Sequence, residues 1–77
     1  MNNKRRKELD ELYEQVEDLK FKLDTIREDE ETYKDNIPEN LQGSERYETA
    51  EEAVEALDNA VDEFDEILNY IETARGR

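Results

Sequence analysis

Several residue types that carry chemistry are missing from this chain of 77 residues. It has no cysteine and no histidine, so it lacks thiol nucleophiles, disulfides, Ser-His and Cys-His catalytic pairs and the usual ligands of zinc. Tryptophan is also absent, and there are only one proline and two glycines. These absences predict a protein with no catalytic residues, no metal site and no cofactor.

Long hydrophobic runs are missing too. No apolar segment approaches the roughly 18 residues of a membrane span. The basic segment NNKRRK is not followed by the apolar stretch of a signal peptide. We therefore expect no membrane association and a location in the cytoplasm.

What the chain has in excess is negative charge. It holds 11 basic and 24 acidic side chains, a net charge of −13. Residues 1–27 are balanced, with seven of each sign, so the whole excess lies in residues 28–77. Such acidity is typical of disordered chains, but the regular spacing of the apolar residues argues against disorder here.

Residues 51–74 form a heptad repeat, EEAVEAL, DNAVDEF and DEILNYI, followed by ETA. A repeat of this kind places its a and d residues on one side of a helix, where they form the seam of a coiled coil. The a and d positions hold Val54, Leu57, Val61, Phe64, Leu68 and Ile71.

An earlier segment follows the same period, from Leu9 onward. Glu30 is the exception, a carboxylate at an a position, which is costly unless that end of the seam is open to water. Phe21 falls at the outward f position, either as a single exposed aromatic or as a contact residue. The other a and d positions hold Leu9, Leu12, Val16, Leu19, Leu23, Ile26 and Tyr33.

Turn signals separate the two segments. Pro38 disfavours helix at and before its own position, and Gly43 follows in NIPENLQGS. Thr49 with Glu52 has the spacing of a capping box ahead of the second repeat. We therefore predict one all-α domain over residues 1–77: a helix at about 4–35, a loop at about 36–48 and a helix at about 49–74. Ile37 and Leu41 are expected to fold back over the end of the seam.

The e positions test whether the helices pair as an antiparallel hairpin. In that arrangement facing residues have numbers with a constant sum, and e faces e. Lys34 with Glu51, Arg27 with Asp58, Lys20 with Asp65, and Tyr13 with Glu72 satisfy the rule and place the turn near Gln42. The sequence thus predicts an antiparallel coiled-coil hairpin.

The g positions of the second helix predict self-association. They carry small or apolar residues that the polar g residues of the first helix cannot cover. We expect a homodimer packed as a four-helix bundle. The predicted dimer contacts are Ala53, Ala60, Ile67 and Ala74.

Carboxylates follow the b and e positions of the second helix over roughly 36 Å, close to one turn of duplex DNA. This acidic ridge is either a solvated face or a mimic of a phosphate backbone; calcium binding is disfavoured because the EF-hand spacing is missing. The ridge consists of Glu48, Glu51, Glu55, Asp58, Asp62, Asp65 and Glu72.

The segment from Asp29 to Leu57, DEETYKDNIPENLQGSERYETAEEAVEAL, resembles short acidic helical proteins of bacteriophages and bacterial mobile elements, which share a DNIPENLQ-x-SER-like loop. The resemblance implies a hairpin shape, a phage or mobile-element origin and hence a bacterial cytoplasm, but no assigned activity and no site residues. The loop itself either caps the hairpin or is read by a partner.

Two functions follow as hypotheses. The first is a non-enzymatic interaction protein that self-associates and binds a protein partner through outward aromatics. The second is an acidic inhibitor, anti-defence or anti-restriction, that occupies the nucleic-acid site of a host protein. Neither binds nucleic acid directly. The candidate contact residues are Phe21 and Tyr70 for the first function, and Glu55, Asp62 and Glu66 for the second.

Overall fold

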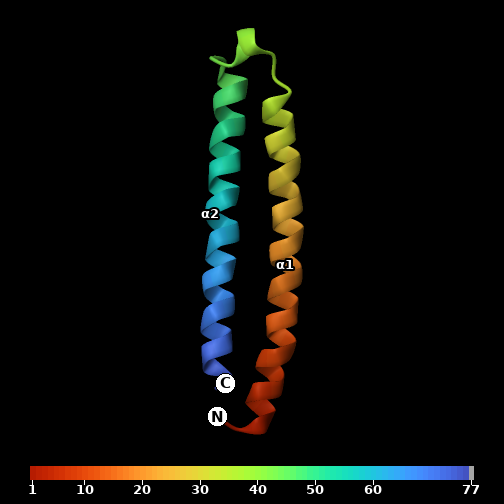
Figure 1. Ribbon diagram of the computed structural model, residues 1–77, viewed down its shortest axis with the longest axis vertical. Helices are drawn as coiled ribbons and strands as arrows, with labels where there is room; N and C mark the ends of the chain where they lie inside the picture. The colour runs from red at the N-terminus through yellow and green to blue at the C-terminus, as the bar shows by residue number, and fades with distance from the viewer. Residues whose placement is uncertain (77) are drawn as a thin grey trace.

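The computed structural model, which describes residues 1–76, is a hairpin of two long helices (Figure 1). Helix α1 spans Asn3–Asp35, a single 3-10 turn η1 spans Glu39–Leu41, and helix α2 spans Glu45–Ala74. The helices run antiparallel, with both chain ends at one end of the hairpin and the turn at the other (Figure 1). The Cα trace of the hairpin extends over 59 × 15 × 15 Å. The predicted all-α hairpin is therefore confirmed.

Polar side chains cap both helices. The Asn2 side chain accepts a hydrogen bond from the backbone N–H of Arg5 at 2.8 Å and opens α1. The Ser44 hydroxyl accepts one from the backbone N–H of Tyr47 at 3.4 Å and opens α2. The predicted start of α2 near Thr49 was therefore wrong by four residues. Ser44 caps first, so Thr49 lies inside the helix and the loop is shorter than predicted.

The loop closes one end of the hairpin. Ile37 is only 3% exposed, and Ala50 and Val54, at the start of α2, are also buried. Ile37 therefore covers the end of the seam as predicted. The same prediction for Leu41 was wrong, because its side chain is 43% exposed on the outside of η1.

Beyond the loop end the core is thin. Leu68 is the one further apolar side chain that is buried among residues 1–76, and α1 contributes no buried residue at all. On α2 the remaining a and d residues are half-buried, in line with the predicted seam. On α1 the half-buried positions are a and e, with Asp24 and Glu31 at b, and no d residue is among them, so α1 is turned about its axis relative to the prediction.

Candidate functional site

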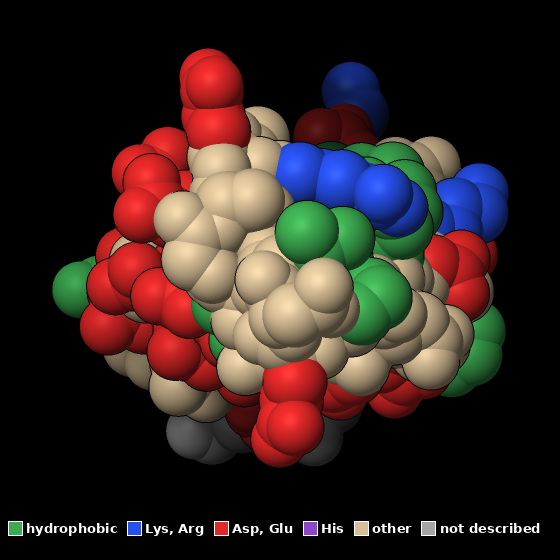
Figure 2. All heavy atoms as spheres, turned by 90° about the horizontal axis from the view of Figure 1, so that it is seen from above, with side chains coloured by type: hydrophobic (Ala, Val, Ile, Leu, Met, Phe, Trp, Pro, Cys, Tyr) green, Lys and Arg blue, Asp and Glu red, His purple; other side chains and the backbone are tan. Residues whose placement is uncertain are grey.

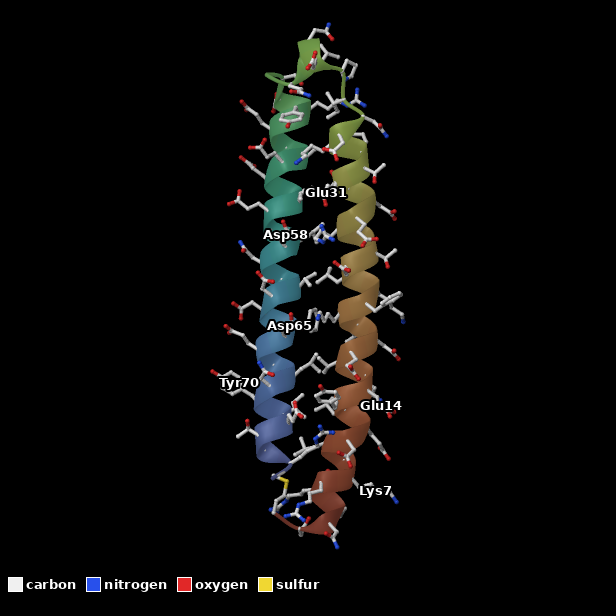
Figure 3. The ribbon with its side chains drawn as sticks, in the orientation of Figure 1. Lys7, Glu14, Glu31, Asp58, Asp65 and Tyr70 are labelled. Atoms are coloured by element: carbon white, nitrogen blue, oxygen red, sulfur yellow. The ribbon has the colours of Figure 1, made fainter. Side chains whose placement is uncertain are left out.

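The e rows of the two helices meet along one flank of the hairpin. Lys20 forms an ion pair with Asp65, and Arg27 lies 3.4 Å from Asp58 between Nε and Oδ1. Figure 3 shows Asp58 and Asp65 on the side of α2 that faces α1. Two of the four predicted e-row pairs are therefore present. The hydrogen bond to Asp65 raises the pKa of the Lys20 ammonium.

The other two predicted e-row pairs are absent. Within residues 1–76, Lys34 and Glu51 form no ion pair. Tyr13 does not pair with Glu72; its ring instead lies under the guanidinium of Arg75, 4.5 Å from the ring centroid. At the open end of the hairpin, therefore, a contact with Arg75 replaces the predicted pairing.

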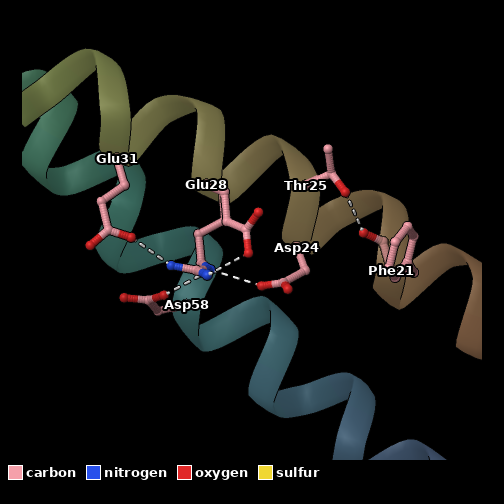
Figure 4. Close-up of polar contacts among 7 residues, drawn as sticks. Phe21, Asp24, Thr25, Glu28, Glu31 and Asp58 are labelled. Atoms are coloured by element: carbon pink, nitrogen blue, oxygen red, sulfur yellow. Dashed lines mark hydrogen bonds and ion pairs between the residues drawn. The ribbon is translucent and has the colours of Figure 1, made fainter.

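Arg27 is the most heavily paired side chain on this flank (Figure 4). Its guanidinium reaches Asp24 at 2.9 Å and Glu31 at 2.7 Å on its own helix, and Glu28 more distantly at 3.8 Å. The hydrogen bond to Asp24, helped by the nearby charge of Asp58, raises the pKa of Arg27. One cation thus pairs with carboxylates from both helices.

Arg75 closes the end of the hairpin opposite the loop. Its side chain is 10% exposed, and Nη1 donates to Asp10 Oδ1 at 2.9 Å while the guanidinium stacks on Tyr13. Arg75 was not among the residues singled out from the sequence. The available signal was its a position, one heptad after Leu68, because an a residue points at the opposite helix.

Because α1 is turned toward its e row, its d row is left about half exposed. At the loop end of this row, Arg46 Nε donates to the Tyr33 hydroxyl at 2.6 Å and its guanidinium lies over the Tyr33 ring, 5.2 Å from the centroid. Leu12, Leu19, Ile26 and Tyr33 are 42–56% exposed. In an antiparallel pair the d and g residues lie on the flank opposite the e rows, so this row shares a face with the g row of α2. We call the eight residues the apolar stripe: Leu12, Leu19, Ile26 and Tyr33 of α1 with Ala53, Ala60, Ile67 and Ala74 of α2.

The g row contributes unequally to this stripe. Ile67 is 44% exposed and Ala74 is exposed, whereas Ala53 and Ala60 are half-buried. The large apolar surface of the stripe therefore comes mainly from α1, which the sequence did not indicate.

The two outward aromatics are exposed as expected but lie on opposite flanks. Phe21 is 75% exposed and lines a surface depression of about 270 Å³ together with Lys20 and Leu68. Tyr70 is 74% exposed and projects from α2 away from α1 (Figure 3). Positions f of α1 and c of α2 turn to opposite flanks of an antiparallel pair. The two rings therefore do not form one contact patch.

Glu55, Asp62 and Glu66 are all exposed and make no ion pair within residues 1–76. Viewed from the loop end, carboxylates crowd the side of the molecule that α2 occupies, whereas Lys and Arg side chains lie over the α1 side (Figure 2). The acidic ridge is continuous in sequence but partly neutralised in space, because α1 pairs with its Asp58 and Asp65.

No group of three or more side chains in residues 1–76 is arranged to hold a metal ion, and neither helix there has an apolar stretch long enough to cross a bilayer. Comparisons of the chain with models of protein families, with curated proteins and with solved structures found no match. The resemblance of the NIPENLQGSER loop to phage-encoded acidic proteins therefore stays a prediction. Its geometry does fit the capping alternative, since Ile37 is buried under the loop.

Proposed function

We propose that this chain is a small, non-enzymatic interaction protein that forms a homodimer through the apolar stripe and binds a protein partner through another face. The observation that carries the proposal is the exposure of a complete d row on α1, at 42–56% for each residue. A helix hairpin offers each helix only one neighbour, so a second apolar row needs a second hairpin. Two hairpins joined at this face make a four-helix bundle.

The accessible surface of the chain supports a second copy as the occupant. It amounts to 5973 Å², whereas a compact monomer of this mass exposes about 4,900 Å². The excess is therefore on the order of 1,000 Å², and a stable interface buries about 800 Å² on each partner. A homodimer through the apolar stripe would remove about the area that the hairpin has in surplus.

A matched pair of substitutions on α2 tests the dimer. Ile67→Glu places a charge in the apolar stripe and should disrupt the dimer, at a cost of a few kcal/mol. Asn69→Glu adds the same charge two residues away, at an outward b position, and should leave the dimer intact. Light scattering after size exclusion measures the mass of each variant. Equal masses for the two variants would remove the apolar stripe as the interface.

The partner-binding face is best placed at Phe21. This ring and the buried Leu68 border the same depression on the flank of the e rows, opposite the apolar stripe. A face on that flank stays open when the stripe is covered. Exposed aromatic rings that lose water on binding dominate many interfaces. Tyr70, near the stripe side of α2, becomes a second contact candidate rather than part of the same patch.

The acidic-inhibitor alternative is favoured by three exposed, unpaired carboxylates, Glu55, Asp62 and Glu66. The two readings separate once a partner has been recovered from a bacterial lysate, the expected source if the chain has a phage or mobile-element origin. Replacing all three carboxylates by Gln should leave binding intact under the aromatic reading, and Phe21→Ala should abolish it. The reverse pattern, with binding that also disappears at high salt, would establish the acidic inhibitor instead.

A further inference from the structure

The apolar stripe can be covered by a second hairpin in two orientations. Its four α1 residues are centred between Leu19 and Ile26, near the middle of a helix that spans Asn3–Asp35. A two-fold axis along the hairpin brings both loops to the same end of the bundle. A two-fold axis across the hairpin brings them to opposite ends. Both orientations cover the whole stripe, so apolar burial does not choose between them.

Charge is divided unequally along the hairpin. The half nearer the loop, residues 21–64, holds 4 basic and 15 acidic side chains, a net charge of −11. The open half, as far as the structure describes it over residues 1–20 and 65–76, holds 6 basic and 9 acidic side chains, a net charge of −3; Arg77 adds the one positive charge that brings the chain to −13. Much of the difference comes from Lys4, Arg5, Arg6 and Lys7, which form the first turns of α1. The centres of the loop half and the open half lie about 30 Å apart along the 59 Å length of the hairpin. This separation exceeds the Debye length of about 8 to 10 Å, so salt largely screens the interaction between the two centres.

We infer that the occupant of the apolar stripe is a second copy of this chain in the opposite-end orientation, with its open half beside the loop half of the first. This inference rests on the proposed homodimer and adds its geometry. In the same-end orientation the two loop halves, each with a net charge of −11, would lie side by side, closer than the Debye length, and would repel each other. In the opposite-end orientation each −11 half faces a −3 half, and the Lys4–Lys7 cluster lies beside partner carboxylates.

The opposite-end orientation also defines the packing layers. It sets α1 against α1 and α2 against α2, each pair antiparallel, so that Leu19 meets Ile26 of the second copy and Ile67 meets Ala60 of the second copy. The second of these layers joins a large residue to a small one, as interdigitating layers require. One local pair opposes this orientation, since the same-end dimer would bring Lys22 level with Glu63. A single exposed pair is weak against a difference of eight charges between the two halves.

The absence of cysteine makes the orientation measurable by spin labelling, because any introduced cysteine is unique. Gly43 lies in the turn, and a Cβ placed on it meets nothing within 4 Å, so Gly43→Cys is a suitable label site. Asn40→Cys on the exposed η1 serves if that variant folds poorly. Pulsed dipolar spectroscopy then measures the distance between the labels of the two copies.

Labels at Gly43 on both copies should lie about one hairpin length apart, on the order of 59 Å. A mixture of chains labelled at Gly43 with chains labelled at Lys7→Cys should instead give a short distance, under about 30 Å. A short distance between two Gly43 labels would overturn the orientation and leave the homodimer standing. No dipolar signal between copies at high micromolar concentration would overturn the homodimer itself, and the inference with it.

A charge test separates the two orientations by the size of its effect. Lys4, Arg5 and Lys7, all exposed, are replaced together by Gln. In the opposite-end dimer these cations face partner carboxylates, so the dissociation constant should rise severalfold in dilute buffer and return toward that of the unchanged chain near 0.5 M salt. In a same-end dimer they would lie beside the −3 half of the second copy, which holds fewer carboxylates than the loop half, and the dissociation constant would change little. An unchanged or lower dissociation constant would overturn the inference.

Discussion

The loop end of the hairpin is closed by its own chain, whereas the rest of its length is not. Near the loop, Ile37, Ala50 and Val54 are 2–7% exposed. Along the remaining described length only Leu68 is buried, and the d row of α1 stays about half exposed. The difference comes from the number of neighbours. At the loop end the connecting segment packs over the two helices and gives each of them a second neighbour. Elsewhere in residues 1–76 each helix has only the other helix as a neighbour.

The loop end makes its core contacts within one chain, whereas the rest of the hairpin leaves the d row of α1 about half exposed. A chain of 77 residues buries little surface, so its stability depends on each contact. Ion pairs such as Lys20 with Asp65 and Arg27 with Asp58 align the helices in the open region, but exposed pairs add little stability. We therefore expect substitutions to have strong effects on stability at the loop end, and effects linked to the proposed dimer along the apolar stripe.

The largest effect is expected at Ile37. Truncation by Ile37→Ala removes the side chain that covers the seam and should lower the free energy of unfolding by about 2 to 4 kcal/mol. Leu41→Ala, in the same loop but 43% exposed, should cost about 1 kcal/mol or less. Urea denaturation at one fixed chain concentration measures both. Equal losses would mean that the loop is not the closed end of the core.

A smaller effect separates two candidate caps of α2. Ser44→Ala removes the hydroxyl that accepts from the Tyr47 N–H and should destabilise the hairpin by about 1 kcal/mol. Thr49→Ala lies at an exposed position inside the helix and should stabilise it by a few tenths of a kcal/mol, because alanine has the higher helix propensity. Thermal unfolding of the two variants should therefore shift in opposite directions. A loss of stability from Thr49→Ala would restore Thr49 as the cap.

Salt should favour the folded state modestly. The loop half carries a net charge of −11, so repulsion between neighbouring carboxylates exceeds the attraction of the few e-row pairs. The melting temperature should rise as NaCl increases from about 20 to about 200 mM. A melting temperature that falls over the same range would show that the attraction of the ion pairs outweighs the repulsion between carboxylates.

The smallest predicted effect is a pH dependence in the open region. Hydrogen bonding to Asp65 raises the pKa of Lys20 above its ordinary 10.5. The folded state therefore holds this proton more tightly than the unfolded state. The contribution is fully present below pH 10.5 and is lost as the pH rises through the higher folded pKa. Between pH 9 and 11, the unchanged chain should lose more stability than Lys20→Met, whose other titrating groups are the same. Identical pH profiles would show that this pair does not stabilise the fold.

Much of the fold could be read from the sequence. The heptads gave both helices, and the constant sum of the e positions gave the register, which the pairs of Lys20 and Arg27 confirm. The start of α2 was misplaced because Ser44 and Thr49 both have capping chemistry. Sequence spacing alone does not say which of two capping residues the chain reaches first in a helical conformation.

The surfaces were harder to predict. A heptad pattern names a and d as the seam but leaves open how far each helix turns about its axis. On α1, the e row pairs with α2 through Lys20 and Arg27, and the d row lies about half exposed. Arg75 was missed for a related reason. Its burial depends on Tyr13 and Asp10, which lie near the start of the other helix and more than 60 residues away in the sequence. The predicted g row is only the smaller part of the apolar stripe.

The most direct test of the central claim is the mass of the unchanged chain in solution. Sedimentation equilibrium at tens of micromolar, in buffer of moderate salt, should give a mass approaching twice the 9.2 kDa of one chain. The same experiment on Ile67→Glu should give a mass near 9.2 kDa. If the unchanged chain keeps the mass of a single copy at several hundred micromolar, the apolar stripe is not covered by a second hairpin and the account is contradicted.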